Sequence, residues 1–348
     1  MMRMGRERRK THMKRQKKAM IMAAILGAGL LSAWMWTGRS EISEENRKLY
    51  EEAVDMQKQV DTLGFEGFCL LDYPVAMYDG TTDYVFYEGE IQKRSPEVET
   101  FVGTAYPVED HFEVIVPTLE QFDSLLSLAG GVEGMVTGSG YGPLEQKATI
   151  WHEAFHAYQL TDFAVLGEKV LPEDTKGELE EKGGEKSEEE WIVTQVDEKK
   201  DVKSKIRQEM EILKKAVELI RTESPAIDEL HKIILEYSER RRQRMEEMPK
   251  SARDAEIRCE LTEGTAYYVE SSVYQMMSGK QAYEERYLEN IGAYEGGRGK
   301  YYRTGLAKCL ILDTLYPGWK ETFDFSRGLD AVIEQYLGGG SDEGQRNV

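Results

Sequence analysis

Residues 151–159 read Trp-His-Glu-Ala-Phe-His-Ala-Tyr-Gln, with two histidines four positions apart. On a helix, residues at this spacing lie on the same face, one turn apart. His152 and His156 can therefore direct two imidazole nitrogens at one metal ion, and Zn²⁺ binds such nitrogens readily. Glu153 lies about 100° around the helix, where it can reach an attacking water as a general base. The stretch predicts a helix that carries a zinc site.

The residues that flank this motif are mostly apolar or small, which predicts a helix buried around most of its circumference. They are Ala148, Thr149, Ile150, Trp151, Ala154, Phe155, Ala157 and Leu160. A bare His-Glu-x-x-His arises by chance in roughly one chain in a hundred of this size, usually on a polar surface helix. In a buried helix, two histidines and a glutamate cost stability unless a metal or hydrogen-bond partners satisfy them. The apolar flanks therefore favour the metal site.

A second predicted helix, over residues 251–279, begins at a capping-box-like sequence and carries carboxylates and phenols on one face. This stripe consists of Glu256, Glu260, Glu263, Tyr267, Glu270 and Tyr274, at spacings of four and three. Glu263 lies among small and aromatic residues, which favours it as the third metal ligand. Glu260, one turn earlier, is the alternative ligand. We expect Gly264 and Ala266 to let this helix approach the metal-site helix closely.

Together these residues resemble the gluzincin zinc metallopeptidases of the peptidase MA-like kind. The resemblance rests on His152-Glu153-x-x-His156-Ala157-x-Gln159 and on Glu263-Gly264-x-Ala266-x-Tyr268. It implies that His152, His156 and Glu263 bind zinc and that Glu153 is the general base. The chain also departs from the family. Roughly a hundred residues separate the two motifs, more than in compact members such as thermolysin, and Tyr267 replaces the aspartate of thermolysin-like enzymes.

The remaining patterns predict an α+β fold, with a small N-terminal β-containing lobe and a mainly helical lobe, which the resemblance implies is zincin-like. Short β-prone runs, separated in places by turn residues, indicate an α/β lobe over residues 64–145. These runs are 68–71, 75–78, 84–87 and 112–116. Helical periodicity indicates a helical metallopeptidase lobe over residues 146–337. Its further helices are predicted at 203–221, 227–248, 300–316 and 331–337, and one more is predicted before the lobe, at 117–129.

Two segments of this part of the chain have the composition of solvated peptide. Residues 167–202 contain Gly-Glu-Lys repeats and acidic runs, and they predict an acidic insertion within the helical lobe. Residues 338–348 predict a flexible polar tail. The glycines at 130–142 fit no phosphate-loop fingerprint, and we expect them to line the cleft before the metal-site helix.

The N-terminal region predicts a membrane anchor. Residues 1–18 carry nine Lys or Arg and a single Glu, and residues 19–38 form a 20-residue stretch without a charge. At 1.5 Å per residue this stretch spans roughly 30 Å, the thickness of a hydrocarbon core. A basic tail before an uncharged span places the tail in the cytoplasm and the rest of the chain outside the plasma membrane. The alternative is a cleaved signal peptide. Residues 39–63, with a helix that starts at Ser43, predict a stalk or a docked connector.

The charge of the chain beyond residue 18 is strongly acidic, with 36 basic and 63 acidic residues, a net charge of −27. Such a body repels polyphosphate, so nucleic acid is excluded as its partner. The predicted partners are a peptide or protein substrate and, through residues 19–38, the lipid bilayer.

The predicted function is zinc-dependent hydrolysis of peptide bonds. The oxyanion of such a reaction needs a hydrogen-bond donor, and the candidates are His231, Tyr267, Tyr301 and Tyr302. Of these we select Tyr302, which lies at the start of the predicted helix that follows the ligand helix. The alternative is that Tyr301 and Tyr302 pack this helix against the core. A membrane-tethered binding or scaffold protein with a retained metal site is the alternative, and the intact Glu153 argues against it. A metal-dependent hydrolase of a non-peptide bond is a third possibility.

Overall fold

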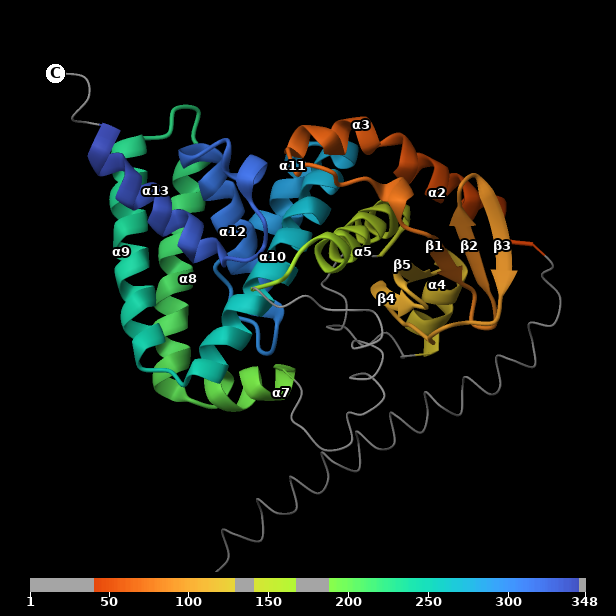
Figure 1. Ribbon diagram of the computed structural model, residues 1–348, viewed down its shortest axis with the longest axis horizontal. Coiled ribbons are helices and arrows are strands. Elements are labelled where there is room, and N and C mark those ends of the chain that lie inside the picture. The colour runs from red at the N-terminus through yellow and green to blue at the C-terminus, as the bar shows by residue number, and fades with distance from the viewer. Residues whose placement is uncertain (1–40, 129–140, 167–187, 344–348) are drawn as a thin grey trace, which may run out of the picture.

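The computed structural model describes residues 41–128, 141–166 and 188–343. A mixed five-stranded sheet lies at one end of this part, and a mainly helical region follows it in sequence and in space (Figure 1). The predicted α+β class is therefore confirmed. The basic tail and the predicted membrane span, residues 1–18 and 19–38, lie outside the described residues. Within the described ranges, no helix has the length and hydrophobicity that crossing a membrane requires.

The sheet has the strand order β3-β2-β1-β5-β4. Its strands are β1 Val75–Tyr78, β2 Asp83–Tyr87, β3 Glu90–Arg94, β4 Thr104–Val108 and β5 His111–Pro117. Strand β1 pairs in parallel with β5, where Val75 lies opposite Val114, and all other pairs are antiparallel. Three of the predicted runs are confirmed as β1, β2 and β5. The run at 68–71 is not a strand, because the chain forms a 3₁₀ turn, Leu70–Asp72, before it enters β1.

Helix α5, Pro143–Asp162, carries the His-Glu-x-x-His motif and lies between the sheet and the helical region (Figure 1). It packs on β5 on one side and on α10, Lys250–Ser278, on the other. Most of its residues are buried, including the fully buried Trp151 and Phe155. The prediction of a helix buried around most of its circumference is thus confirmed. Gly142 is the N-cap of this helix, and its N–H donates to the Glu145 carboxylate over 2.9 Å.

Helix α2, Glu44–Asp55, continues through α3, Gln57–Val60, and a 3₁₀ turn, Asp61–Leu63. Ser43 caps α2 as predicted. Of the two expected arrangements for this segment, stalk or docked connector, the described residues are docked. Trp151 Nε1 donates to the carbonyl oxygen of Ala53 over 3.2 Å, and Lys147 forms an ion pair with Glu52.

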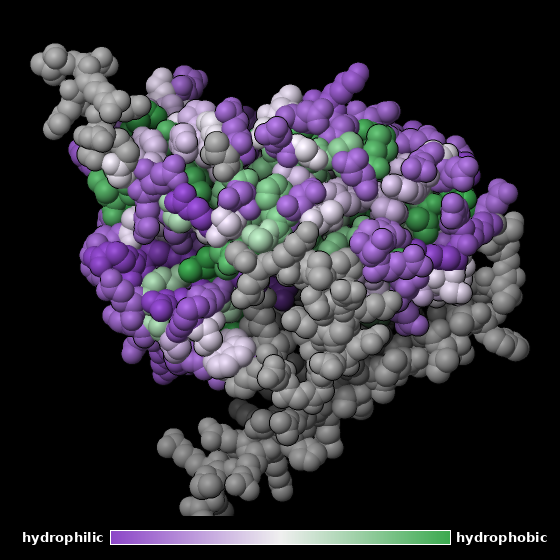
Figure 2. All heavy atoms as spheres, viewed as in Figure 1, coloured by the Kyte–Doolittle hydropathy of each residue, from purple (hydrophilic) through white to green (hydrophobic). Residues whose placement is uncertain are grey.

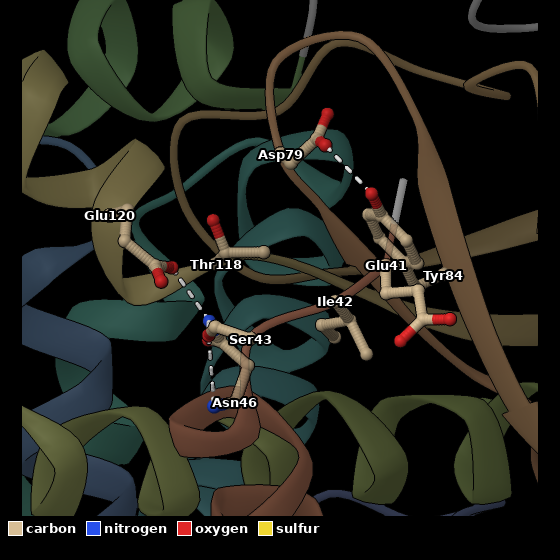
Figure 3. A pocket seen from close by; sticks show the side chains of 8 residues that line it. All are labelled: Glu41, Ile42, Ser43, Asn46, Asp79, Tyr84, Thr118 and Glu120. Atoms are coloured by element: carbon tan, nitrogen blue, oxygen red, sulfur yellow. Dashed lines mark hydrogen bonds between the residues drawn. The ribbon is translucent and has the colours of Figure 1, made fainter. Parts of the chain in front are cut away.

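A small pocket lies where the chain enters α2, next to α4, Leu119–Leu128 (Figure 3). The buried Asn46 ties these elements together, because its amide donates to Ser43 and Glu120 and accepts from the N–H of Leu119. The residues that line the pocket are Glu41, Ile42, Ser43, Asn46, Asp79, Tyr84, Thr118 and Glu120. They include neither of the motif histidines, so this pocket is separate from the candidate metal centre.

The helical region contains the long helices that the periodicity predicts. Besides α10 they are α8 Lys200–Ile220, α9 Ile227–Glu246, α12 Gly299–Leu315 and α13 Leu329–Glu343. Short helical segments connect them: α7 Glu188–Ile192, α11 Lys280–Tyr283, the π-helical turns Val193–Asp197 and Glu284–Leu288, and the 3₁₀ turn Trp319–Thr322. On the face seen in Figure 2, hydrophilic side chains predominate and hydrophobic ones show as separate patches. The helices also bury apolar side chains, such as Leu213 of α8, Ile234 of α9 and Leu306 of α12.

The described residues of two predicted solvated segments are largely helical. Residues 167–187 of the predicted insertion lie outside the described residues, whereas 188–197 and 200–202 are helical, with Ile192 and Val196 buried. These two side chains lie four positions apart, on one face of the helical segment. The mean composition of residues 167–202 is acidic and does not reveal this apolar face. Helix α13 also extends to Glu343, into the predicted tail.

Helices α10 and α12 approach each other closely at Gly264 and Gly305. A Cβ atom at Gly305 would lie 2.3 Å from the Cα of Gly264 and 2.8 Å from the carbonyl oxygen of Glu260. Helix α10 does pack on the metal-site helix α5, as expected of the helix that carries Gly264 and Ala266, but Gly264 does not provide that contact because it faces α12. The contact with α12 matters for the site because Gly264 directly follows Glu263.

Candidate metal centre

The motif helix α5 directs His152 and His156 at a common point. Their Nε2 atoms are 3.1 Å apart, and the His152 side chain is almost fully buried. Glu263 reaches the same point from α10. Its Oε2 atom lies 3.3 Å from Nε2 of His156 and 3.8 Å from Nε2 of His152. The potential ligand atoms of the three residues all lie within 4.8 Å of one another, so the predicted triad is brought together.

The outward-facing nitrogen of each imidazole lies close to a polar side chain. His156 Nδ1 lies 2.9 Å from Oε1 of Gln159, whose amide in turn donates to Thr265 Oγ1. His152 Nδ1 lies 2.9 Å from Oε2 of Glu270, an ion-pair contact in which the ring N–H is not aligned with the oxygen. These contacts leave Nε2 of each ring facing the centre. Two oriented imidazoles and one carboxylate oxygen are a donor set that suits a catalytic zinc ion.

The electrostatics of the triad couple metal binding to pH. Burial alone would lower the pKa of His152, but the Glu263 and Glu270 carboxylates raise it to about 10. Burial would likewise raise the pKa of Glu263, yet the charges and hydrogen bonds of the two histidines hold it well below its ordinary value. A metal ion competes with the histidine proton for the same nitrogen, so binding releases protons and weakens as the pH falls.

Glu153 lies beside the triad rather than in it. It follows His152 on α5, is 9% exposed, and accepts a hydrogen bond from the backbone N–H of Ala105 in β4. Burial raises the pKa of its carboxyl group. Gly103 passes very close, since a Cβ atom there would lie 2.7 Å from Cγ of Glu153 and 2.6 Å from Cγ2 of Thr149. A carboxylate near the ligands, but not among them, has the location that a general base requires.

Glu260, the alternative ligand, points away from the centre into a buried network of charges. Its Oε2 atom accepts hydrogen bonds from Arg241 Nη2 over 2.9 Å and from Lys308 Nζ over 2.5 Å. Arg244 joins the network through Glu256, whose pKa is lowered to about 2 because the charges of Arg244 and Arg241 outweigh its burial. Glu260 is thus a structural partner of these cations, and Glu263 is the carboxylate at the centre.

Of the four candidate oxyanion donors, Tyr302 lies nearest the triad. Its ring stacks on His152, with 5.9 Å between the ring centroids and 10° between the planes, and its hydroxyl donates to Glu263. Tyr267 contacts Tyr302 ring to ring. Tyr301 is buried among Ile192 and Cys259.

The fourth candidate donor, His231, packs against Tyr336 of α13. It therefore does not join the group around the metal ligands.

Three side chains at the centre were not predicted in these roles. Glu270 contacts His152 and accepts from the Tyr287 hydroxyl over 2.9 Å, and Arg298 Nη1 donates to Oε1 of Glu263 over 3.0 Å. Glu270 belongs to the carboxylate stripe and lies seven residues beyond Glu263, two helical turns on the same face. Glu270 thus places a carboxylate beside His152, although Tyr267 replaces the aspartate of thermolysin-like enzymes. No local pattern indicates Tyr287 or Arg298, which come from later segments of the chain.

Comparison with known proteins does not identify a family for this chain. No protein-family model, no curated protein and no solved structure matches the chain. The described structure therefore establishes a buried His-His-Glu group that could hold a metal ion, in a mainly helical region, with motif spacing that fits His-Glu-x-x-His.

Proposed function

We propose that the chain is a zinc-dependent metallopeptidase of the gluzincin kind, with a zincin-like catalytic lobe. The observation that carries this proposal is the convergence of His152, His156 and Glu263, with the non-ligand carboxylate of Glu153 beside them. A structural metal site has no need of such a carboxylate. The combination of an oriented N, N, O donor set and a nearby base favours hydrolysis over a purely structural role.

A zinc ion held by His152, His156 and Glu263 would supply Lewis-acid activation of a water and of the scissile carbonyl. Glu153 takes the proton of the attacking water and passes it to the nitrogen of the leaving amine. The hydrogen bond from Ala105 holds the Glu153 carboxylate in place. Tyr302 donates to the carbonyl oxygen as negative charge develops there.

Strand β4 offers a backbone surface for the peptide substrate. Among the described strands it pairs only with β5 and is the edge of the sheet on the side of α5. An extended peptide can add to such an edge through main-chain hydrogen bonds. Because Ala105 of β4 also contacts Glu153, a peptide bound along this edge would pass the general base.

The N-terminal patterns support a second part of the proposal, which is a membrane location. We propose that residues 19–38 anchor the chain in the plasma membrane with the catalytic domain outside. Protease shaving of intact cells should then remove the domain and leave a small N-terminal fragment. Recovery of the full-length chain from the cytosol would contradict this, and a mature N-terminus near Ala33 would indicate secretion instead.

The catalytic proposal is tested by zinc content and peptide cleavage of the purified full chain in detergent. We expect about one zinc per chain, sharply lowered by His156→Ala or Glu263→Ala and retained by Glu260→Ala, provided that each variant folds. A zinc-loaded chain should cleave a diverse peptide mixture. Stoichiometric zinc without cleavage would favour the scaffold alternative, and loss of zinc in Glu260→Ala alone would overturn the ligand assignment.

A further inference from the structure

The two oxygens of the Glu263 carboxylate have different surroundings. Oε2 faces the Nε2 atoms of His156 and His152, at 3.3 Å and 3.8 Å. Oε1 instead accepts a hydrogen bond from Nη1 of Arg298 over 3.0 Å. A carboxylate can bind a metal ion through one oxygen or through both. A charged donor on Oε1 therefore bears directly on how many coordination positions Glu263 takes.

The backbone that precedes Arg298 is held in place at Gly297. Gly297, with a φ of 63° that glycine adopts readily, donates its N–H to Oδ2 of Asp197 over 2.7 Å. Lys300 Nζ, fully buried, donates to Oδ1 of the same Asp197 over 3.0 Å and to the carbonyl of Gly297 over 2.6 Å. Tyr294 donates its hydroxyl to Asp197 as well.

The segment before α12 is thus fixed on a single acid, Asp197, whose side chain is 12% exposed. This acid comes from the π-helical turn that follows α7, a hundred residues earlier in the chain.

We propose that Arg298 is a positioning residue that keeps Oε1 of Glu263 occupied, so that this carboxylate binds the metal through Oε2 alone. Asp197 supports this role by fixing the backbone that carries Arg298. The inference rests on the proposed metal centre. Its consequence is an additional open position, which a catalytic zinc site needs for water and substrate and which two-oxygen binding would fill.

Tyr302 also donates to Glu263, and it must be distinguished from Arg298. It reaches the carboxylate from α12 while its ring stacks on His152. Its hydroxyl is neutral, whereas the Arg298 guanidinium is charged, and hydrogen bonds from charged donors are roughly twice as strong as neutral ones. Arg298 should therefore dominate the orientation of the carboxylate.

The experiment replaces zinc with Co²⁺, which accepts similar ligands and has visible d–d bands that weaken as the coordination number rises. Spectra are recorded at saturating Co²⁺ with the metal content determined, so that they compare coordination and not occupancy. In Arg298→Met the freed Oε1 turns to the metal, and the bands weaken severalfold and shift to higher energy. Arg298→Lys keeps a charged donor and restores bands close to those of the wild type. Tyr302→Phe leaves them unchanged.

Asp197 has a matched control in Asp313. Each accepts from a tyrosine hydroxyl, from another N–H and from a buried lysine, the partners of Asp313 being Tyr268, Trp319 and Lys320. Asp197→Asn should weaken the Co²⁺ bands in the same direction as Arg298→Met, by a smaller factor, and Asp313→Asn should not change them. An equal effect of both substitutions would show a general loss of rigidity and contradict the role of Asp197.

The outcomes separate this inference from the proposed function. If the wild-type chain takes up neither Zn²⁺ nor Co²⁺ stoichiometrically, the metal centre itself is refuted, and the inference falls with it. If it takes up Co²⁺ and Arg298→Met, folded by circular dichroism, gives the wild-type spectrum, only the inference is refuted. A change in Tyr302→Phe without one in Arg298→Met would assign the positioning role to Tyr302.

Discussion

The contact between Gly264 and Gly305 predicts a specific and measurable loss of stability in Gly305→Ala. The new Cβ would lie 2.3 Å from the Cα of Gly264, whereas ordinary van der Waals contact begins at 3.4 Å. The two atoms nearest to this Cβ, the Cα of Gly264 and the carbonyl oxygen of Glu260, belong to the backbone, so no flexible side chain can move aside. Helices α10 and α12 must separate by about 1 Å, and their facing side chains lose dispersion contacts.

The magnitude follows from two opposing effects. Overpacking of a well-packed interface costs about 1–3 kcal/mol, and a clash between two backbones belongs at the upper end of that range. The higher helix propensity of alanine relative to glycine stabilises the folded state by about 1 kcal/mol. We therefore expect Gly305→Ala to lower the free energy of unfolding by about 2 kcal/mol.

The assay is urea unfolding followed by far-UV circular dichroism, with Gly338→Ala as the matched control. Gly338 is also helical, but a Cβ there would meet no atom within 4 Å, so the same substitution should stabilise the chain slightly or leave it unchanged. If Gly305→Ala proves as stable as Gly338→Ala, the close packing of α10 on α12 is refuted.

Three further predictions concern the centre and its surroundings. Glu270→Gln should weaken zinc binding by about 10- to 100-fold, measured by chelator competition, because it removes the carboxylate that orients His152; unchanged affinity would deny Glu270 that role. Gly103→Ala should displace Glu153 and slow peptide hydrolysis by about 10- to 100-fold at unchanged zinc content, and full activity would contradict the close approach. Acid should destabilise the fold through Glu256. Its pKa falls from 4.5 to about 2 on folding, so its stabilisation is complete above pH 4.5 and lost as the pH falls through 2. Urea unfolding measured between pH 5 and pH 2 should show that the free energy of unfolding falls by about 3 kcal/mol. This part of the pH dependence should be absent in Glu256→Gln.

The sequence predicts the elements of this fold that depend on local patterns. Helix α5 and the long helices of the C-terminal region follow from 3.6-residue periodicity, and β1, β2 and β5 follow from their runs of β-branched and aromatic residues. Strands β3 and β4 were missed, because Glu-Ile-Gln-Lys-Arg and Thr-Ala-Tyr-Pro-Val carry charges and a proline. The charged side chains of β3 are mostly exposed, and Pro107 is tolerated in β4 because one side of an edge strand has no strand partner. The local sequence does not reveal which strand is at the edge.

In the candidate site, too, the residues that share one helix could be predicted from local spacing, whereas contacts between distant segments could not. His152, Glu153 and His156 share one helix, so their arrangement follows from spacing alone. Glu263 was selected over Glu260 from its small neighbours, and the structure supports that choice by giving Glu260 two cationic partners, Arg241 and Lys308.

The outer contacts of the site could not be predicted from the sequence. Arg298 contacts Glu263 from a segment that is itself hydrogen-bonded to Asp197, a hundred residues earlier in the chain. Contacts of this kind arise from tertiary packing and leave no periodic signature in a single sequence.

The central claim is that Glu153 acts as a general base beside a zinc ion, and one rate comparison tests it most directly. Peptide hydrolysis is measured for the wild type and for Glu153→Gln at equal, verified zinc content. Since a positioned general base contributes about 10²- to 10⁴-fold, the variant should retain its zinc and lose at least that lower factor in kcat. A zinc-loaded Glu153→Gln that hydrolyses peptides at the wild-type rate would contradict the account.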